Sequence, residues 1–461
     1  MYQNIVQLKL FSRSNPLSKA YRNVFPAWVA AVFLLTGCAS TVPYKSYDYV
    51  SEEIAKNIGA VITPEPVYGE EQIPDGISLE DGLTEQEAVA IALWNNAAFQ
   101  ADLAQLGVSR AEMLTAGMFK NPNFTMLFPI GTKQLESWLL LPLSEFKMRP
   151  HRLDIARLSA SKVADSLIQN GLNLARDTQL AFANLFQAEK TLALFTEQAQ
   201  LDSKIADIAK KQFQLGDISE LEAHRKAIDA MNVLDQKNRM GHDVQVFRHR
   251  LISLLGIESV EDFKLVPETI SYAGEDINNL LKTAYASRPD LRIVELEIES
   301  AGKQIGWEED KVINFIGILD ANSVKTEVGP GMRLDIPIFN QNEGGIARAH
   351  AELDVAGKKY LAVREKIKLS VLETHTQFLS AKEGFEIVTN KILPQQEKRL
   401  NISRQALENG EISFLSNLEV ERDWILAKVR EIAALADLQR TTAQLGHSIG
   451  RPVHLMKDST L

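Results

Sequence analysis

An internal repeat constrains this chain more than any other feature of its sequence. Short groups of residues recur in the same order at a spacing of about 190 residues, which is the signature of a duplicated structural unit. One such match carries little weight, but an ordered series is hard to obtain by chance. The sequence therefore predicts two halves of one architecture, residues 83–270 and 271–455, followed by a tail at 456–461. The matched groups are Lys120, Asn123 and Phe124 with Lys311, Asn314 and Phe315; Leu141-Pro142-Leu143 with Ile336-Pro337-Ile338; Gly216-Asp217-Ile218-Ser219 with Gly410-Glu411-Ile412-Ser413; and Leu255-Gly256 with Leu445-Gly446.

Each half is expected to contain one β-hairpin, at 121–143 in the first half and at 312–338 in the second. The segment from Met332 to Ile336 alternates apolar and polar residues, as a sheet with two unlike faces requires. The first hairpin alternates poorly, because Trp138-Leu139-Leu140-Leu141 is a continuous apolar run. We expect strands of about 9 to 11 residues joined by very short turns, a length that lets a tilted strand cross a bilayer.

Helices are expected before and after each hairpin. Thr84 and Glu87 have the spacing of a capping box at a helix start. The residues after each hairpin contain few helix breakers and carry apolar residues in heptads, which predicts long antiparallel coiled-coil pairs. Gly216 and Gly410 are expected to end helices in a left-handed backbone conformation. The expected long helices cover 151–213, 217–255, 345–409 with an interruption at Pro394, and 415–443.

The N-terminal residues predict export and a lipid anchor. Residues 1–37 combine a basic start without acidic residues and an apolar run from Val24 to Leu35, as export signals do. Leu35-Thr36-Gly37-Cys38 resembles the bacterial lipobox, in which the cysteine is lipidated and becomes the new N-terminus; Ala39 then favours the outer membrane. The alternative is an ordinary signal peptide with a chance cysteine. Cys38 is the only cysteine, so it can form no internal disulfide. Residues 38–82 are expected to form an extended leader.

Charge and motifs exclude several classes of function. The formal net charge is −10, and no basic cluster outside the N-terminal segment could bind phosphates, which argues against nucleic-acid binding. The eight histidines show no metal-ligand spacing. No phosphate loop, nucleophile elbow or Cys/His set is present, so neither a cofactor nor an enzymatic activity is predicted.

The ordered set of motifs resembles the TolC-like outer-membrane efflux family over about residues 83–452. The motifs are the strand-to-helix segment from Ile336 to Gly344, the Ile392-Leu393-Pro394 step, and the two turns that end at Gly216 and Gly410. The resemblance implies a mainly α fold with a small β part. Its long antiparallel helices would form a helical barrel, and its four strands would contribute to a trimeric 12-stranded transmembrane β-barrel. Physics agrees with this implication, since an open sheet edge cannot face lipid and three copies of four strands would close a barrel of twelve.

The function implied by this resemblance is that of an outer-membrane exit duct in a tripartite efflux or type I secretion-like system. Its expected partners are two further copies of the chain, a periplasmic adaptor (membrane fusion) protein, an inner-membrane pump and outer-membrane lipid. Two alternatives remain: a periplasmic coiled-coil lipoprotein acting as a scaffold or adaptor without a barrel, and a lipid-anchored enzyme. The cargo stays open among drugs, metal ions and secreted proteins.

The resemblance also assigns candidate site residues. The turns containing Gly216 and Asp217, and Gly410 and Glu411, would form the periplasmic tips that contact the adaptor. Glu419 would face its copies around the closed periplasmic aperture as a gate. Ser416 occupies a second position that is acidic in the family, which predicts a weaker ring. The alternative is that Glu419 lies on a solvated helix face.

Overall fold

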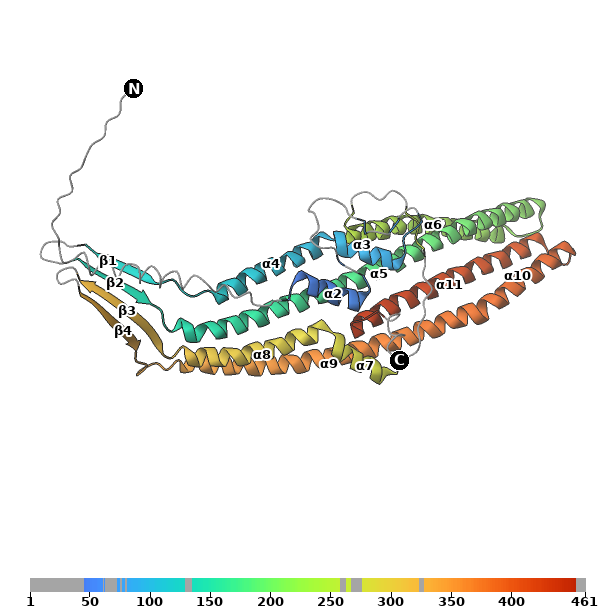
Figure 1. Cartoon of the computed structure of the whole chain (residues 1–461). Coiled ribbons are helices and arrows are strands. Elements are labelled where there is room, and N and C mark those ends of the chain that lie inside the picture. Colours follow the sequence, from blue (N-terminus) through green and yellow to red (C-terminus); the bar gives the residue numbers. More distant parts are fainter. Residues whose placement is uncertain are drawn as a thin grey trace, which may run out of the picture.

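The computed structural model describes residues 45–60, 62, 73–74, 77–78, 81–128, 135–257, 263–266, 276–322 and 327–452. The molecule is elongated, with a sheet at one end and helices that run from it to the opposite end (Figure 1). The predicted fold class is confirmed in its helical content and its four-stranded antiparallel sheet. Within the described part of the chain, no helix is both long enough and apolar enough to span a membrane. The predicted signal, Cys38 and the tail at 456–461 lie outside the described residues.

The sheet contains four antiparallel strands in the order β1-β2-β3-β4, so β1 and β4 are its two edges. β3 (Asn314–Asn322) and β4 (Glu327–Asp335) have nine residues each, as expected. The expected length is wrong for β1 (Asn123–Leu127) and β2 (Glu136–Leu141), which have five and six residues. Pro122 precedes β1 and Pro142 follows β2, and neither can donate a ladder hydrogen bond. The predicted turn residues 131–133 and 323 lie outside the described part.

The register of the strands places apolar residues on one face of the sheet. The sequence of the first hairpin alone does not reveal this face. Residues paired directly across strands share a face. Phe124 pairs with Leu139, Leu139 with Leu319, and Leu319 with Pro330. On the same face, Met332 and Leu334 of β4 are 64% and 41% exposed. The opposite face carries polar residues among apolar ones; its polar members include Asn123, Thr125, Glu136, Asn314, Asp320, Arg333 and Asp335.

The first half continues into two long helices. α3 (Glu85–Asn95) begins with the predicted capping box of Thr84 and Glu87, which is confirmed, and α4 (Ala97–Gly117) leads to β1. α5 (Glu145–Leu215) has 71 residues, which at 1.5 Å per residue is about 107 Å. It starts earlier than expected and includes Pro150 near its beginning. After the Gly216 turn, α6 (Glu220–Leu255) returns along α5.

The second half has corresponding elements. α7 (Ile277–Ser287) and α8 (Pro289–Asp310) precede β3, and α9 (Glu343–Ile387) follows β4. The predicted interruption is a π-helical turn at Val388–Ile392, just before Pro394. Proline lacks an N–H and clashes with the carbonyl four residues earlier, and the wider turn accommodates both effects. α10 (Leu393–Glu408) and α11 (Phe414–Ile449) complete the half.

Residues 38–82 were expected to form an extended leader, but Tyr47–Ile58 form a helix, α2, so the expectation is wrong for this segment. Val50 and Ile54 of α2 are fully buried in a hydrophobic cluster to which α3, α4, α5 and α6 also contribute. Gly171 of α5 creates the space for it, because a Cβ there would lie 3.1 Å from Ile54 Cδ1. Lys45 adds an ion pair of 2.8 Å with Asp165, which is 3% exposed. α2 therefore belongs to the core of the molecule.

Neighbouring helices form a layer that repeats the order of the strands. Next to the sheet, α4 packs on α5, α5 on α8, and α8 on α9. α4 and α9 are the two flanks of this layer, as β1 and β4 are the edges of the sheet. Beyond the middle of the molecule, α6 packs on α5, α5 on α11, and α11 on α10. One chain is thus an open sector of strands and helices.

Candidate gate and helix tips

The two predicted tip turns lie at the same end of the molecule, opposite the sheet (Figure 1). Gly216 has φ 85° and Gly410 has φ 75°, which confirms the predicted left-handed conformation. At each tip the next residue closes the turn: Asp217 N donates to Gln212 O over 2.8 Å, and Glu411 N donates to Ala406 O over 2.8 Å.

Serine caps the helix that leaves each tip. Ser219 Oγ accepts from Glu222 N over 3.2 Å, and Ser413 Oγ accepts from Ser416 N over 3.0 Å. Exposed apolar side chains surround the turns, with Leu215 at 78%, Leu221 at 80% and Phe414 at 54% exposure. Two rigid turns with apolar surroundings are suited to bind another protein, as exposed apolar patches often do.

Glu419 binds a residue of the other helical hairpin. Its carboxylate forms a short ion pair with Lys226 Nζ of α6. The Lys226 side chain is 15% exposed and that of Glu419 is 39% exposed, so the pair is partly shielded from water. This contact joins the α5–α6 hairpin to the α10–α11 hairpin. Ser416 forms hydrogen bonds with Ser413 in the N-terminal cap of α11 and takes no part in this pair.

Further polar contacts hold α10 to α11 beside this pair. Arg399 pairs with Asp423 over 2.9 Å, and Arg404 pairs with Glu421 over 3.6 Å. A groove of about 970 Å³ lies between the hairpins and is lined by polar side chains, among them those of Lys226, Glu419 and Asp423.

Asp202 of α5 lies buried at the base of the same groove. Burial raises the pKa of its carboxyl, against the lowering effect of a hydrogen bond from Gln198. Because burial disfavours the charged form, an ionised Asp202 destabilises the packing around it relative to the protonated, neutral form. Sequence reasoning missed both Asp202 and Lys226.

The signal that could have found Lys226 is its distance from the tip. Lys226 and Glu419 follow the matched glycines Gly216 and Gly410 by nearly the same number of residues. Two antiparallel hairpins whose tips align bring such residues to the same height. Opposite charges at equal heights then predict a cross-hairpin pair, although a sequence separation of 193 residues hides it from any local pattern.

Metal binding finds no support in the geometry of the described residues. Among them, no group of three or more His, Cys, Asp or Glu side chains is placed to hold a metal ion. The polar groups of the candidate gate instead neutralise one another in pairs. Ion pairs such as Lys226–Glu419 hold the α5–α6 and α10–α11 hairpins together while they are formed, and breaking them would let the hairpins separate.

Similar proteins are found both by sequence and by structure. No family model matches the chain. The cobalt-zinc-cadmium resistance protein CzcC of Cupriavidus metallidurans is 19% identical over 377 residues, which cover 80% of this chain and 90% of CzcC.

Two solved structures extend this likeness to the fold. The outer-membrane channel OprN matches with a TM-score of 0.63 and 16% identity, covering 79% of this chain and 89% of OprN. The open state of the Neisseria gonorrhoeae MtrE outer-membrane channel matches with a TM-score of 0.62 and 14% identity, covering 85% of this chain and 98% of MtrE. The predicted resemblance is therefore confirmed, and the chain has the fold of the TolC-like outer-membrane channels.

Proposed function

We propose that this protein is the outer-membrane exit duct of a tripartite efflux system and works as a homotrimer. One observation carries the proposal: the sheet and the helical layer beside it have the same order and are both open at their two flanks. Each strand is thus connected in sequence to one helix of the layer: β1 to α4, β2 to α5, β3 to α8 and β4 to α9. Copies joined flank to flank would produce one tube that passes from helices into strands.

The chemistry of the sheet supports a position in lipid. An unpaired strand edge in hydrocarbon leaves N–H and C=O groups without partners, and each such group costs several kcal/mol. Three copies of a four-stranded sheet would close a barrel of twelve strands. The apolar face, with Phe124 and Met332 more than 60% exposed, would then meet lipid. The face with Thr125, Asp320 and Arg333 would line the water-filled interior.

Mass measurement in detergent and heat-modifiable gel migration test this proposal. We expect particles of three chains, and migration that changes when the sample is boiled in SDS, because closed barrels resist SDS until heated. A folded monomer that migrates identically with and without boiling would favour the scaffold without a barrel. That alternative gives no reason for an apolar face that spans all four strands.

The other predicted parts extend the proposal. Cys38 would carry the lipid anchor, and the tips at Gly216, Asp217, Gly410 and Glu411 would contact a periplasmic adaptor that connects to the inner-membrane pump. Cross-linking from cysteines placed at Asp217 and Glu411 should capture an adaptor in cells. If cysteines on the apolar face of the sheet captured the adaptor and those at the tips did not, the proposed orientation, with the tips in the periplasm, would be contradicted.

The gate would lie at the cross-hairpin pair of Lys226 and Glu419. In a trimer, three such pairs would hold the hairpins together at the narrow end of the duct. This differs from a simple ring of repelling carboxylates, since each Glu419 is bound to a cation of its own chain. Opening would require these pairs to break.

Divalent transition-metal cations are the cargo that we propose. The name of CzcC concerns resistance to cobalt, zinc and cadmium, and the formal charge of −10 of this chain favours cations in a duct. Deleting the gene should increase sensitivity to Zn²⁺ or Cd²⁺, with little effect on sensitivity to an organic dye. The opposite pattern would exclude metal cations as the main cargo.

A further inference from the structure

A small cavity lies near the middle of the molecule, where the N-terminal segment approaches the end of the last helix (Figure 1). Its walls are the end of α2, the start of α3, one face of α5 and the end of α11, and its volume is about 100 Å³. One water takes up about 30 Å³ in the liquid, so the cavity has room for a few waters or one small ion of several atoms. Drug-sized ligands need pockets of about 300 Å³ or more, which excludes them here.

Two helix caps fix the walls of this cavity. Gly59 ends α2 with φ 84°, and Gly450 ends α11 with φ 74°. Beyond Gly450, Arg451 N donates to Gly446 O over 3.0 Å, so the cap holds the backbone that carries the Arg451 side chain. Asn57, in the last turn of α2, also lines the cavity and is only 4% exposed.

Hydrogen-bond donors at this cavity lack acceptors. Arg451 Nε is buried and has no hydrogen-bond partner. Among the described residues, the side chain of Asn57 makes no hydrogen bond and that of Arg451 makes no ion pair. A buried donor without an acceptor costs free energy, which a bound acceptor would recover.

The charged groups that line the cavity are two guanidinium groups and one carboxylate. The cations are Arg176 and Arg451, and the carboxylate is that of Glu85. Asp177 pairs with Arg176 over 2.7 Å, but its side chain is 46% exposed and does not line the cavity, so water screens its charge. The cavity itself is therefore left with an excess of positive charge.

The histidine in the cavity wall reports this positive potential. Burial lowers the pKa of His447, and the charges of Arg176 and Arg288 lower it further, while Asp290 offsets only part of the effect. The carbonyl oxygens at this end of α11 add little negative potential, because they are bound: Gly450 N donates to His447 O, and Arg288 donates to Ser448 O. A field of this sign attracts an anion.

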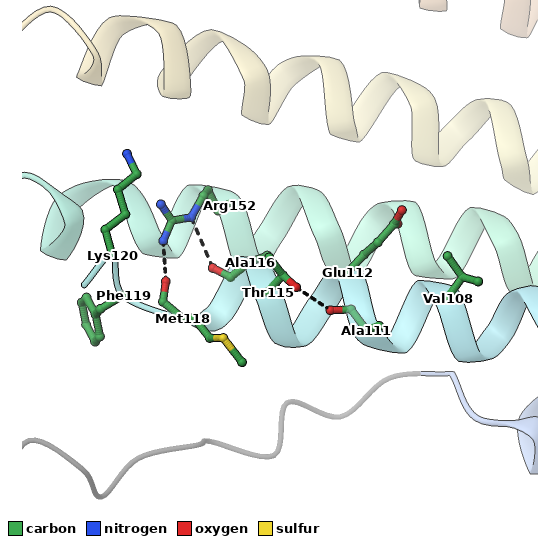
Figure 2. Close-up of a pocket in the computed structure, with 9 residues that line it drawn as sticks. All are labelled: Val108, Ala111, Glu112, Thr115, Ala116, Met118, Phe119, Lys120 and Arg152. Atoms are coloured by element: carbon green, nitrogen blue, oxygen red, sulfur yellow. Dashed lines mark hydrogen bonds between the residues drawn. The ribbon is translucent and has the colours of Figure 1, made fainter.

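The larger groove at the end of α4, drawn in Figure 2, differs in this respect. Its Arg152 donates to the carbonyl oxygens of Ala116 and Met118 and pairs with Glu145. Its Lys120 pairs with Glu145 as well, over 2.8 Å. Both cations of that groove thus have acceptors within the chain, whereas Arg451 has none among the described residues.

We propose that the cavity binds a small oxyanion, with inorganic phosphate as the ligand that fits its size. The oxygens would accept hydrogen bonds from Arg451 Nε, from the Asn57 amide and from the Arg176 guanidinium, and bonds to an ionised acceptor are the stronger kind. α2 packs on α5, and the anion would add a link from α2 to the end of α11. The site lies within one chain, so it does not depend on the proposed trimer.

Thermal unfolding of the full-length protein in detergent tests the site. At equal ionic strength, replacing chloride with phosphate should raise the midpoint by at least about 2 °C, because a ligand that binds only the folded state stabilises it by mass action. Phosphate also stabilises proteins without binding, through exclusion from their surface, so the comparison is between variants. Arg451→Gln keeps the backbone cap and should lose the specific part of the effect.

Arg239→Gln is the matched control, since Arg239 is an exposed arginine of α6 that does not line the cavity. It should respond to phosphate as the parent does. Arg451→Lys keeps the charge and should retain part of the response, which keeps the test decisive if Arg451→Gln does not fold. Acetate at the same concentration separates the two kinds of oxyanion: a larger shift with acetate than with phosphate would assign the site to carboxylates.

Trypsin cleavage after Lys56 provides a second readout that is specific to α2. The Lys56 side chain is 57% exposed, but its backbone is helical, so cleavage requires the last turn of α2 to open. Phosphate should slow this cleavage at least about threefold in the parent, and should not slow it in Arg451→Gln or Asn57→Leu. Equal phosphate effects on the parent and on Arg451→Gln, in the midpoint or in the cleavage rate, would overturn the proposal.

Discussion

Removing the positive charge of Lys226 should open the duct without unfolding it. Lys226→Met keeps the apolar stem of the side chain, which lies largely buried, and removes only the cation that binds Glu419. Because more than a third of Glu419 is exposed, solvent screening limits the pair to about 1 kcal/mol. Three pairs that break together on opening would contribute about 3 kcal/mol, which shifts the ratio of closed to open ducts about 100-fold.

Single-channel recording in planar bilayers measures this shift directly. We expect Lys226→Met and Glu419→Gln each to raise the open probability strongly, and the double variant to add little to either. Arg239→Met is the matched control, because Arg239 forms an exposed pair with Asp235 within α6 and links no second hairpin. Equal open probabilities for Lys226→Met and the parent, or strictly additive effects of the two gate variants, would refute the reasoning.

Three further predictions concern stability and anchoring. Gly256→Ala should lower the free energy of unfolding by more than about 2 kcal/mol, because a Cβ there meets Asn95 O at 2.3 Å. Gly216→Ala has open space around it and should lower the free energy of unfolding by only about 1–2 kcal/mol. Chemical denaturation of both variants measures the difference, and equal losses would contradict this prediction. Burial lowers the pKa of His447 to about 4. The contribution of His447 to stability is therefore present above its ordinary pKa of 6.5 and is lost, by about 3 kcal/mol in all, as the pH falls towards 4. His447→Gln should flatten this part of the pH profile of the thermal midpoint, and an unchanged profile would contradict the prediction. Cys38→Ser should abolish palmitate labelling of the protein in cells, and mass spectrometry that finds an unmodified Cys38 in membrane-purified protein would exclude the anchor.

Local sequence patterns were sufficient for the repeat, the positions of the hairpins, the long helices and the turns that end two of them at Gly216 and Gly410. The capping box at Thr84 depends on two side chains three residues apart, and the turns at Gly216 and Gly410 depend on backbone freedom at one position. Heptads report which face of a helix will be buried, whatever buries it. The resemblance to the TolC-like family added an ordered set of such local signals, and the fold bears it out.

Only the tertiary structure decided how these elements meet. Nothing local marks α2 as part of the core, because its burial depends on the gap that Gly171 leaves more than a hundred residues later. The partner of Glu419 is equally remote, since Lys226 comes from the other hairpin. The alternation of the first hairpin became clear only when the register aligned Phe124 and Leu139 on one face with Leu319. Periodicity specifies that a face is buried, but which surface covers it depends on the packing of distant segments, and for α4 and α9 that surface belongs to a second chain in our proposal.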